Sequence, residues 1–558
     1  MKLLIQIGIC FMCLTPVFGQ NLENLDEITK RKFMEFKGSL TIGANFYHTT
    51  ADRGQQNPFS YIISGTPVLS IYGFDLPLSF TFASQQFSVA GPNTDMFDRY
   101  GMSPYYKWVT VHAGYRNVSF SPYTLNNHNF LGGGFELKPG KWRIGFVYGR
   151  FTDAIEEDTT ASNPLGPSYK RKGYAAKLGY GDNKNHIEFS FLKAKDDVNS
   201  IEQPTFTDIS PAENLSVGLS GKLTFLKNFS IETHLGVSAF TEDITARELS
   251  AYEDLPLLNL RQFYQPKASS RVDFAGDVSL NFQQSWYSVK AQYMRIDPEY
   301  ETMGSYYFNN DIERYTIAPN FTFWKGKLTL GGSIGIQQDN LLKDKAATTR
   351  RVISSTNMQV NPFPQFSVNA QYSNYATEQS SGLVKLNDTI RVFQVNHSIS
   401  ITPSYFIAKE QFYHTFVLAL SKQTLQDKNR FTENYTESVT NNANFNYQLR
   451  NNQFAYTLSG GLNYLKLNNV SQELNRYGFS AGAEKGLWEE KVKLGLNGMY
   501  NISRADGQGD GFILTNTLNI SYIPSPAHAF IIRGQSILNR TSFEYNDYML
   551  SVNYNFNF

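Results

Sequence analysis

The chain has 558 residues with 50 Lys+Arg against 49 Asp+Glu, a balance that excludes a global field steering nucleic acid or an anionic surface toward it. Aromatic residues make up 15% of the chain, with 43 Phe and 34 Tyr, although the mean hydropathy is negative. A soluble protein this aromatic normally has a more apolar core, whereas a membrane β-barrel needs aromatics on its lipid face and polar residues on the other, so the composition favours a barrel.

The N-terminus has the pattern of a secretory signal. An apolar run from Leu3 to Leu14 is followed by compact residues up to Gly19, where cleavage is predicted. The run is too short to span a bilayer as a helix, and no later stretch approaches the roughly 20 apolar residues that a membrane helix needs. Cys10 and Cys13 both lie inside the predicted signal. The mature chain is therefore expected to have no thiol, no disulfide and no lipid anchor.

From about Gly38 onward one unit repeats: a strand, a tight turn, a second strand and a longer polar loop. Two strands of ~10 residues plus one long loop fit the spacing of the turns, which are predicted at 73–75, 106–108, 138–141, 181–184, 226–228, 283–285, 324–327, 450–452 and 525–527. The pattern predicts an all-β protein, a large antiparallel transmembrane β-barrel of about 26 strands with a range of about 22 to 30. Its predicted parts are a signal peptide (1–19), a short periplasmic lead (20–37) and the barrel (38–558).

Side chains alternate inside the predicted strands. Between Val272 and Phe282 apolar residues or glycine occupy every second position, and Asp273 and Asp277 lie on the other phase. Prolines are expected at strand ends just before the tight turns, because proline lacks a ladder donor; these are Pro104, Pro319, Pro362, Pro403 and Pro524. If the C-terminus is periplasmic, the tight turns are periplasmic and the long loops are extracellular.

The polar phase of the strands predicts the wall of the lumen. The inward-pointing candidates carry both signs of charge: Lys177, Glu188, Lys222, Glu232, Asp273, Asp277, Lys290, Arg314, Lys493 and Arg533. Because opposite charges are mixed, strong anion or cation selectivity is not expected. Pairing within a hydrated wall accounts for most of these side chains.

The loop from Glu242 to Ser270 is more apolar than the other predicted loops. Its apolar residues are Leu255, Leu257, Leu258, Leu260 and Phe263. Exposure of so many apolar side chains to water would be unfavourable. Two interpretations stay open: the loop folds inward as a constriction, or it binds a partner protein.

No pattern in the sequence predicts a catalytic, cofactor or metal site. The eight histidines lack ligand spacing. The run 505–511 lacks the full ligand set of a calcium loop and favours a turn with positive φ. Gly132 to Gly134 follows no strand–helix switch and indicates a bend or a place where a side chain packs inside. There is no G-x-S-x-G motif, so an enzyme is not predicted, although the sequence cannot bring a particular Ser beside a particular His.

The chain ends on a strand with one apolar face. Tyr548, Leu550, Val552, Tyr554, Phe556 and Phe558 occupy alternate positions. Such an ending resembles the C-terminal signature of gram-negative outer-membrane β-barrel proteins. The resemblance implies an integral outer-membrane location, contact with outer-membrane lipid and with the barrel assembly machinery, and a role for Tyr554, Phe556 and Phe558 as an assembly signal.

A barrel of this size needs something in its lumen. With over twenty strands it would leak solutes unless it were partly filled. The first hypothesis is a transport or translocation pore, without cofactor, that is gated by its own loops. The second is a scaffold or secretion-complex subunit whose lumen or rim is occupied by a partner protein. A surface enzyme or adhesin is a third hypothesis. The lead at 20–37 is too short for the plug domain of a TonB-dependent receptor.

Overall fold

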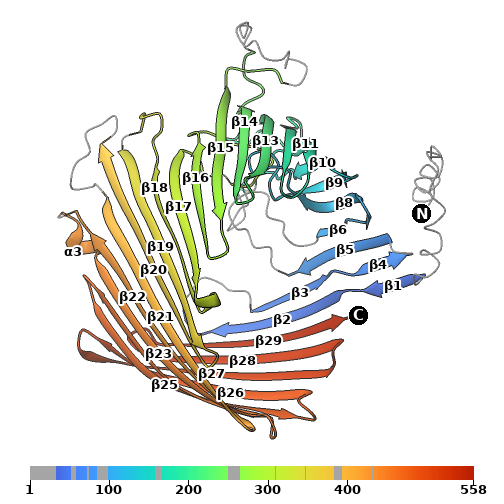
Figure 1. The fold of residues 1–558 in the computed structure, drawn as a ribbon. Coiled ribbons are helices and arrows are strands. Elements are labelled where there is room, and N and C mark those ends of the chain that lie inside the picture. Colours follow the sequence, from blue (N-terminus) through green and yellow to red (C-terminus); the bar gives the residue numbers. More distant parts are fainter. Residues whose placement is uncertain are drawn as a thin grey trace.

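The computed structural model describes residues 33–51, 58–71, 74–84, 99–157, 166–248, 264–307, 309–345, 347–381, 392–429 and 431–558. These residues form one antiparallel sheet of 29 strand segments that closes on itself (Figure 1). The predicted signal peptide and residues 20–32 of the predicted lead lie outside the described residues. Among the described residues, no helix combines the length and apolarity that a membrane crossing would require.

The wall has 26 strands, as the turn pattern predicts, because three pairs of segments each continue one strand across a short break. β1 (Met34–Lys37) and β2 (Ser39–Thr49) form the first strand. β3 (Phe59–Gly65) and β4 (Val68–Ile71) both pair along β5 (Phe74–Ala83), and β6 (Arg99–Met102) and β7 (Tyr105–Tyr106) form the next strand. The wall therefore begins at Met34, within the segment predicted as a lead.

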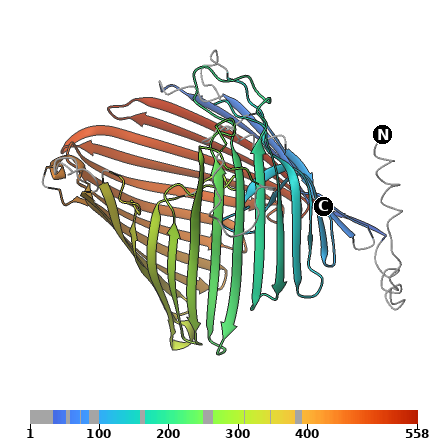
Figure 2. The same ribbon diagram turned by 90° about the horizontal axis from the view of Figure 1, so that it is seen from above.

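The remaining strands follow in chain order around the wall. They are β8 (Val109–Val118), β9 (His128–Leu137), β10 (Trp142–Thr152), β11 (Arg171–Gly181), β12 (His186–Asp196), β13 (Glu213–Phe225), β14 (Phe229–Thr241), β15 (Ser270–Gln283), β16 (Tyr287–Ile296), β17 (Ile312–Phe323), β18 (Leu328–Gln338), β19 (Ala347–Phe363), β20 (Phe366–Ser381), β21 (Phe393–Lys409), β22 (Phe412–Asp427), β23 (Ser438–Asn451), β24 (Tyr456–Asn469), β25 (Glu473–Leu487), β26 (Val492–Ala505), β27 (Gln508–Ser525), β28 (His528–Arg540) and β29 (Tyr545–Asn557). In the described part of the chain two short helices, η3 (Trp324–Gly326) and α3 (Glu433–Thr436), lie between strands. Figure 2 shows the middle strands (green) and the C-terminal strands (orange to red) on opposite sides of the wall.

The barrel closes where the last strand meets the first. β29 pairs with β2 from Ser39 opposite Asn557 to Thr49 opposite Asp547. The backbone N–H of Gly38 donates to the carbonyl of Phe558 at 2.8 Å, and the N–H of Phe558 donates back at 3.0 Å. The Phe558 ring stacks on Phe36 with 4.5 Å between centroids. The terminal aromatics therefore lie at the seam, and closure removes the free sheet edge that would otherwise pair with other chains.

The two ends of the barrel differ. Connections of two to four residues join the strands at one end, called here the turn end, which also holds the last residues of β29. The opposite end, the loop end, carries the longer connections, but 470–472, 506–507 and 541–544 are short there too. This corrects the expectation of long loops at every hairpin. The strands β19–β27 have 14–18 residues against 10–11 for β8–β12, so the C-terminal wall itself extends further and replaces the loops.

A belt of large apolar side chains covers the outer face. Leu462, Phe479 and Leu496 are 57–63% exposed, and Leu462 lies directly beside Phe479 in the sheet. Isolated exposed leucines are common on soluble proteins, but a contiguous apolar belt of this kind marks a lipid-facing surface. The outer face therefore fits a bilayer and the alternate phase of each strand forms the inner wall.

Two prolines lie further from the turns than predicted. Pro319 is four residues before the end of β17, and Pro403 is six residues before the end of β21. Each pairs with the preceding strand, but the pairing with the following strand is interrupted at that position. The missing N–H affects only one neighbour, so a strand can accommodate one such gap. Pro362 and Pro524 do lie beside the turns, next to register shifts.

Candidate functional site

Two loops from the loop end fold into the barrel. The first inward loop (119–127) connects β8 to β9, and the second inward loop (297–311) connects β16 to β17. Phe120, Tyr123, Leu125, Tyr300 and Met303 are all at most 5% exposed. Neither loop was predicted to enter the lumen, because its sequence does not differ from that of an ordinary polar loop.

The first inward loop spans the inner wall from β10 to β15. The ammonium of Lys177 lies 5.0 Å from the centre of the Phe120 ring. Thr124 donates a hydrogen bond to Ser190 at 3.0 Å. The Tyr123 hydroxyl donates to Asp277 at 3.0 Å. These contacts come from three different strands, so they fix the loop across the lumen rather than along one strand.

The second inward loop is held by a buried polar network. Asn214 donates to Ser238 at 2.7 Å and accepts from the backbone N–H of Met303 at 3.1 Å. Ser216 donates to Thr302 at 3.2 Å. Asn214, Ser216 and Ser238 are fully buried on the inner faces of β13 and β14. Buried polar groups are stable only when hydrogen-bonded, so the network fixes both the loop and the wall beneath it.

The two inward loops also bind each other. The Thr302 hydroxyl donates to the carbonyl of Thr124 at 3.0 Å, and the Tyr300 hydroxyl donates to the carbonyl of Tyr123 at 2.5 Å. Burial raises the pKa of Tyr300 and also that of Tyr123, which Asp277 raises further. Both phenols therefore stay protonated and keep their donor role at physiological pH.

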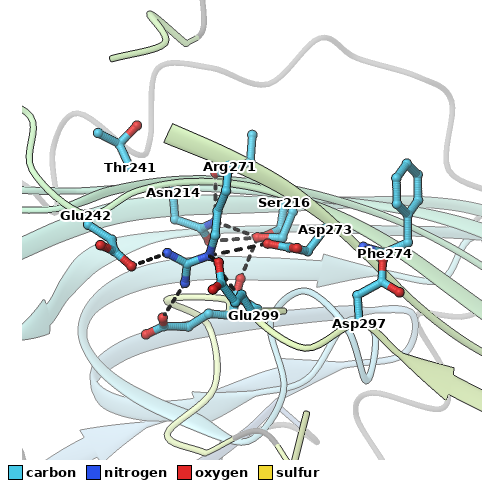
Figure 3. A network of polar contacts seen from close by, with 12 residues as sticks. Asn214, Ser216, Thr241, Glu242, Arg271, Asp273, Phe274, Asp297 and Glu299 are labelled. Atoms are coloured by element: carbon cyan, nitrogen blue, oxygen red, sulfur yellow. Dashed lines mark hydrogen bonds and ion pairs between the residues drawn. The ribbon is translucent and has the colours of Figure 1, made fainter. Parts of the chain in front are cut away.

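Arg271 on β15 connects the wall to the second inward loop at the loop end (Figure 3). Its guanidinium lies 3.3 Å from Asp273, 3.1 Å from Glu301 and 3.6 Å from the carboxylate of Glu299, and it also binds Glu242. One cation thus gathers four carboxylates from the wall and from two loops. Arg271 positions the loops through this arrangement, and the surplus negative charge makes this rim acidic.

A row of glycines crosses the wall beside these loops. Gly101, Gly114, Gly132, Gly149 and Gly173 are consecutive cross-strand partners on five neighbouring strands. A Cβ on Gly132 would lie 2.1 Å from the carbonyl oxygen of Tyr148. The sequence predicts a bend or an inward-packed side chain at Gly132 to Gly134. The close contact at Gly132 is between backbones, whereas a Cβ on Gly134 would lie 2.7 Å from Cγ1 of Val147. The ladder partners of Gly132 could not have been identified from sequence.

The inner wall differs between the two sides of the barrel. On the filled side, inner-face residues of β10–β14 lie beneath the loops and are 0% exposed: Val147, Ala175, Leu192, Asn214, Ser216 and Ser238. On the open side, inner-face residues of β23–β28 are exposed to solvent: Asn444, Asn446, Gln448, Asn497, Asn519 and Arg533. The described loops therefore fill one part of the lumen and leave a polar surface accessible along the other.

Most of the predicted lumen residues lie on or next to the filled side. Lys177, Glu188, Lys222, Glu232, Asp273, Asp277, Lys290 and Arg314 are carried by β11–β17, whereas Lys493 and Arg533 lie on the open side. Lys177 lies 3.6 Å from Glu136, and Glu188 lies 2.6 Å from Arg143.

Other members of the set have near neighbours too. Lys222 stands directly opposite Glu232 in the sheet, and Lys493 lies 3.2 Å from Glu490. Arg314 donates to the sulfur of Met294 at 3.3 Å. Lys290 stands opposite Asn281. The structure therefore brings two of these residues into contact with the first inward loop, Asp277 through Tyr123 and Lys177 through Phe120. The other contacts named here are with residues of the wall or its turns.

The apolar residues predicted to form a constriction, Leu255, Leu257, Leu258, Leu260 and Phe263, lie outside the described residues. The next described residue, Tyr264, is 8% exposed and its hydroxyl is 2.6 Å from that of Thr241. The role of this loop as a constriction or partner site stays a prediction.

Serine and histidine come together at two places in the described part of the wall. The hydroxyl of Ser220 lies 3.0 Å from Nδ1 of His234, whose Nε2 is 3.9 Å from Glu232. The hydroxyl of Ser103 lies 2.8 Å from Nδ1 of His112, whose Nε2 is 3.4 Å from Glu136. A hydrolytic serine also needs donors for an oxyanion. The N–H of Ser103 donates to the carbonyl of Pro77 at 3.1 Å, and Pro104 has no N–H. We therefore assign no reaction to this trio.

The described residues contain no group of three or more His, Cys, Asp or Glu side chains that could hold a metal ion. The run 505–511 contains a two-residue turn in which Asp506 has φ 51° and Gly507 has φ 80°. This agrees with the predicted positive-φ turn.

The closed ring, the apolar outer belt and the polar inner wall decide the class of the protein. The chain has the fold of an outer-membrane β-barrel. No protein-family model matches the sequence, and no curated protein matches it either.

Solved structures of outer-membrane proteins are similar in overall shape. OccAB2 of Acinetobacter baumannii matches 69% of this chain and 98% of its own, with 8% identity and a TM-score of 0.31. OpdK of Pseudomonas aeruginosa, determined with vanillate, matches 70% of this chain and 99% of its own, with 11% identity and a TM-score of 0.31. The siderophore receptor PirA of Pseudomonas aeruginosa matches 94% of this chain and 81% of its own, with 11% identity and a TM-score of 0.38. Likeness at this level carries no argument about substrate or mechanism.

Proposed function

We propose that this barrel is a transport pore of the outer membrane whose passage follows the open side and whose width is set by the two inward loops. In this proposal the turn end faces the periplasm and the loop end faces the outside. The observation that carries it is the contrast between the buried inner wall under the loops and the exposed inner wall of β23–β28.

The chemistry of the open side supports a water-filled passage. Asn444, Gln448, Asn497 and Asn519 carry amides, and Arg533 carries a fixed charge. Removing such groups from water without new partners would be unfavourable. Uncharged amides bind solutes weakly by hydrogen bonds, which allows entry and release. A lumen left wet along one side is what conduction of small polar solutes requires.

The inward loops are suited to act as a gate. Their anchors are hydrogen bonds and ion pairs rather than strand pairing, and water could replace each of them when a loop moves. Thr302 is the central anchor because it bonds both Ser216 on the wall and Thr124 on the other loop. Release of this point would separate the two loops, and loss of their other anchors, such as Tyr123 to Asp277 and Arg271 to Glu301, would then widen the passage into the filled side.

A crosslink tests this gate. The described residues contain no cysteine, so the double variant Ser216→Cys with Thr302→Cys would create a single disulfide between wall and loop. In planar bilayers the reduced protein should conduct and switch between levels, while the oxidised protein should stay at the lower level. A matched control, Ser333→Cys with Ser355→Cys, joins two wall strands whose hydroxyls are 2.8 Å apart and should not respond to oxidation.

Different outcomes of these experiments would contradict the gate and the pore. Identical switching of the oxidised and reduced loop variant would remove the gate and leave the pore. A barrel that inserts but never conducts would remove the pore itself. If such a silent barrel copurifies with one stoichiometric protein in mild detergent, the alternative applies, in which a partner occupies the lumen or rim.

A further inference from the structure

A row of polar side chains crosses five neighbouring strands on the outer face near the loop end. Lys422 stands opposite Asn441, Asn441 opposite Lys466, Lys466 opposite Asn475, and Asn475 opposite Arg504. These residues share the phase of the exposed apolar residues on β22–β26, so they point away from the lumen. We call Lys422, Asn441, Lys466, Asn475 and Arg504 the cationic row.

The cationic row marks the upper edge of the apolar belt. The next outward positions toward the turn end are Leu420, Ala443, Tyr464, Tyr477 and Ile502, which are again consecutive partners across the same strands. A charged or amide side chain therefore gives way to apolar surface within one step along every strand. Such a step is expected where the hydrocarbon of a bilayer meets the headgroups.

A groove opens directly below the cationic row. It has a volume of about 280 Å³ and is lined by Ile399, Ile401, Leu420, Ala443 and Tyr464, with Lys422 and Asn441 at its edge. The small side chain of Ala443 lies between Leu420 and Tyr464 and leaves the space open. The groove is apolar below and cationic above, which is the shape and polarity of an amphiphile with an acidic headgroup.

The row carries more positive charge than its neighbours neutralise. Lys466 binds Glu473 at 3.0 Å, and Asn475 donates to the same carboxylate at 2.8 Å. Lys422 and Arg504 are exposed, and within the described part of the chain no carboxylate lies within ion-pair distance of either. Strands are spaced ~4.8 Å apart, so each cation stands roughly 10 Å from the next and the outer two stand roughly 19 Å apart.

We propose that the cationic row and the groove bind a lipid whose headgroup carries a net negative charge from phosphate groups, in the membrane leaflet at the loop end. The phosphates accept hydrogen bonds from Lys422, Lys466 and Arg504, which are charge-assisted and therefore strong. The amide of Asn441 adds a neutral donor between the two lysines. One acyl chain fills the groove beside Ala443. This site needs only an inserted barrel and is independent of conduction.

Native mass spectrometry of the purified barrel tests the site. The probes are a bis-phosphorylated saccharide lipid, phosphatidylcholine and inorganic phosphate. The wild type should retain the bis-phosphorylated saccharide lipid well above phosphatidylcholine, because the choline cation of phosphatidylcholine cancels the charge of its phosphate. The variant Lys422→Gln, Lys466→Gln, Arg504→Gln should bind the saccharide lipid about 100-fold more weakly, from the usual contribution of each cation near an anionic surface. A matched control, Lys227→Gln, Lys325→Gln, Lys491→Gln, removes three lysines from turns at the opposite end and should bind as the wild type does.

The groove has its own test, with the charges left in place. Ala443→Phe fills the space between Leu420 and Tyr464 and should reduce lipid retention at least tenfold, whereas Ala481→Phe, on the outer face of β25 and outside the groove, should not. Heat-modifiable migration confirms that each variant is folded. Equal retention by the triple variant and its control overturns the proposal. So does equal binding of phosphatidylcholine, or competition by millimolar inorganic phosphate, which would indicate an ordinary anion site.

Discussion

At the scale of single residues, glycine decides how closely the strands around the inward loops approach. Gly132 points into the barrel, and a Cβ there would meet the carbonyl oxygen of Tyr148 at 2.1 Å and the Cα of Gly149 at 2.6 Å. Both obstacles are backbone atoms, so no side chain can rotate away. Gly133, the next residue, points outward and a Cβ there would find its nearest neighbour at 3.5 Å.

Gly132→Ala is therefore expected to weaken the barrel, while Gly133→Ala is a matched control in the same strand. Overpacking of this kind costs about 1–3 kcal/mol, and the cost should appear as a lower melting temperature of the heat-modifiable form in detergent. Near-equal melting of the two variants would show that the wall relaxes freely at this point.

Asp311 clamps two connections at the loop end. Its carboxylate accepts from the backbone N–H groups of Asn340 and Leu341, both at 2.9 Å, and from Lys345. Burial by itself would raise the pKa of Asp311, but the hydrogen bonds from Lys345 and the two amides outweigh it and lower the pKa. A lowered pKa in the folded state means that this stabilisation is present above the unfolded value near ~3.9 and is lost as the pH falls below it.

Asp311→Asn should release segment 339–345 at neutral pH. The amide has a single acceptor oxygen, and its NH₂ group would face one of the two backbone N–H groups that donate to the carboxylate. Leaving a buried partner unsatisfied costs about 1–3 kcal/mol. Hydrogen exchange of a peptide from 339–345, corrected for intrinsic rates, should be faster in the variant at pH 7. The wild type should reach similar rates only below about pH 4. If hydrogen exchange of segment 339–345 in Asp311→Asn still increases below about pH 4, a group other than Asp311 causes the pH dependence.

At the scale of elements, β29 both ends the chain and closes the barrel against β2. Its outward aromatics stack on the preceding strand, with 4.6 Å between the centroids of Phe530 and Tyr554, and along the strand, with 5.0 Å between Phe556 and Phe558. The inward positions Asn555 and Asn557 carry the same backbone pairing without this aromatic contact.

Deletion of Phe556 to Phe558 should reduce outer-membrane insertion at least tenfold. The seam loses its last residue pairs with β2, and the chain loses the C-terminal aromatics that are expected to act as an assembly signal. The double variant Asn555→Ser, Asn557→Ser changes the polar phase of the same strand and should insert normally. The heat-modifiable band in membrane fractions measures both. Wild-type levels of that band in the deletion variant would contradict the assigned role.

At the scale of the whole molecule, the difference between the ends sets the expected orientation. The connections at 153–170, 242–269 and 382–392 belong to the loop end, whereas 138–141, 324–327 and 526–527 belong to the turn end. The cationic row also lies toward the loop end, so orientation determines which leaflet it meets.

A protease site inserted after Thr245 should be cut on intact cells, whereas the same site inserted after Gly326 should be cut only once the outer membrane is broken. Segments 152–171, 242–270 and 376–390 are the expected natural targets. Cleavage of intact cells at the Gly326 site alone would reverse the orientation and place the cationic row in the opposite leaflet.

The sequence by itself determined the class of fold, because that information is local. The alternation around Val272 to Phe282, the turn at 324–327 and the aromatic ending at Phe558 each follow from neighbouring residues in the chain. Summed along the chain, they gave a count near the 26 strands of the wall. The placement of single prolines, the length of the last loops and the start of the wall differ from the prediction, since ladder gaps, strand extension and pairing at the seam depend on neighbouring strands.

Tertiary structure alone decided what the barrel encloses and what it presents to the membrane. Tyr300 meets Tyr123 across 177 positions of sequence, and no local pattern marks either residue as buried. The glycine row and the cationic row exist only through the register of five strands, which pairs residues such as Lys422 and Asn441 that are unremarkable on their own. Periodicity specifies the face of a strand on which a side chain lies, but register and loop folding specify its neighbours, and the proposed function depends on those neighbours.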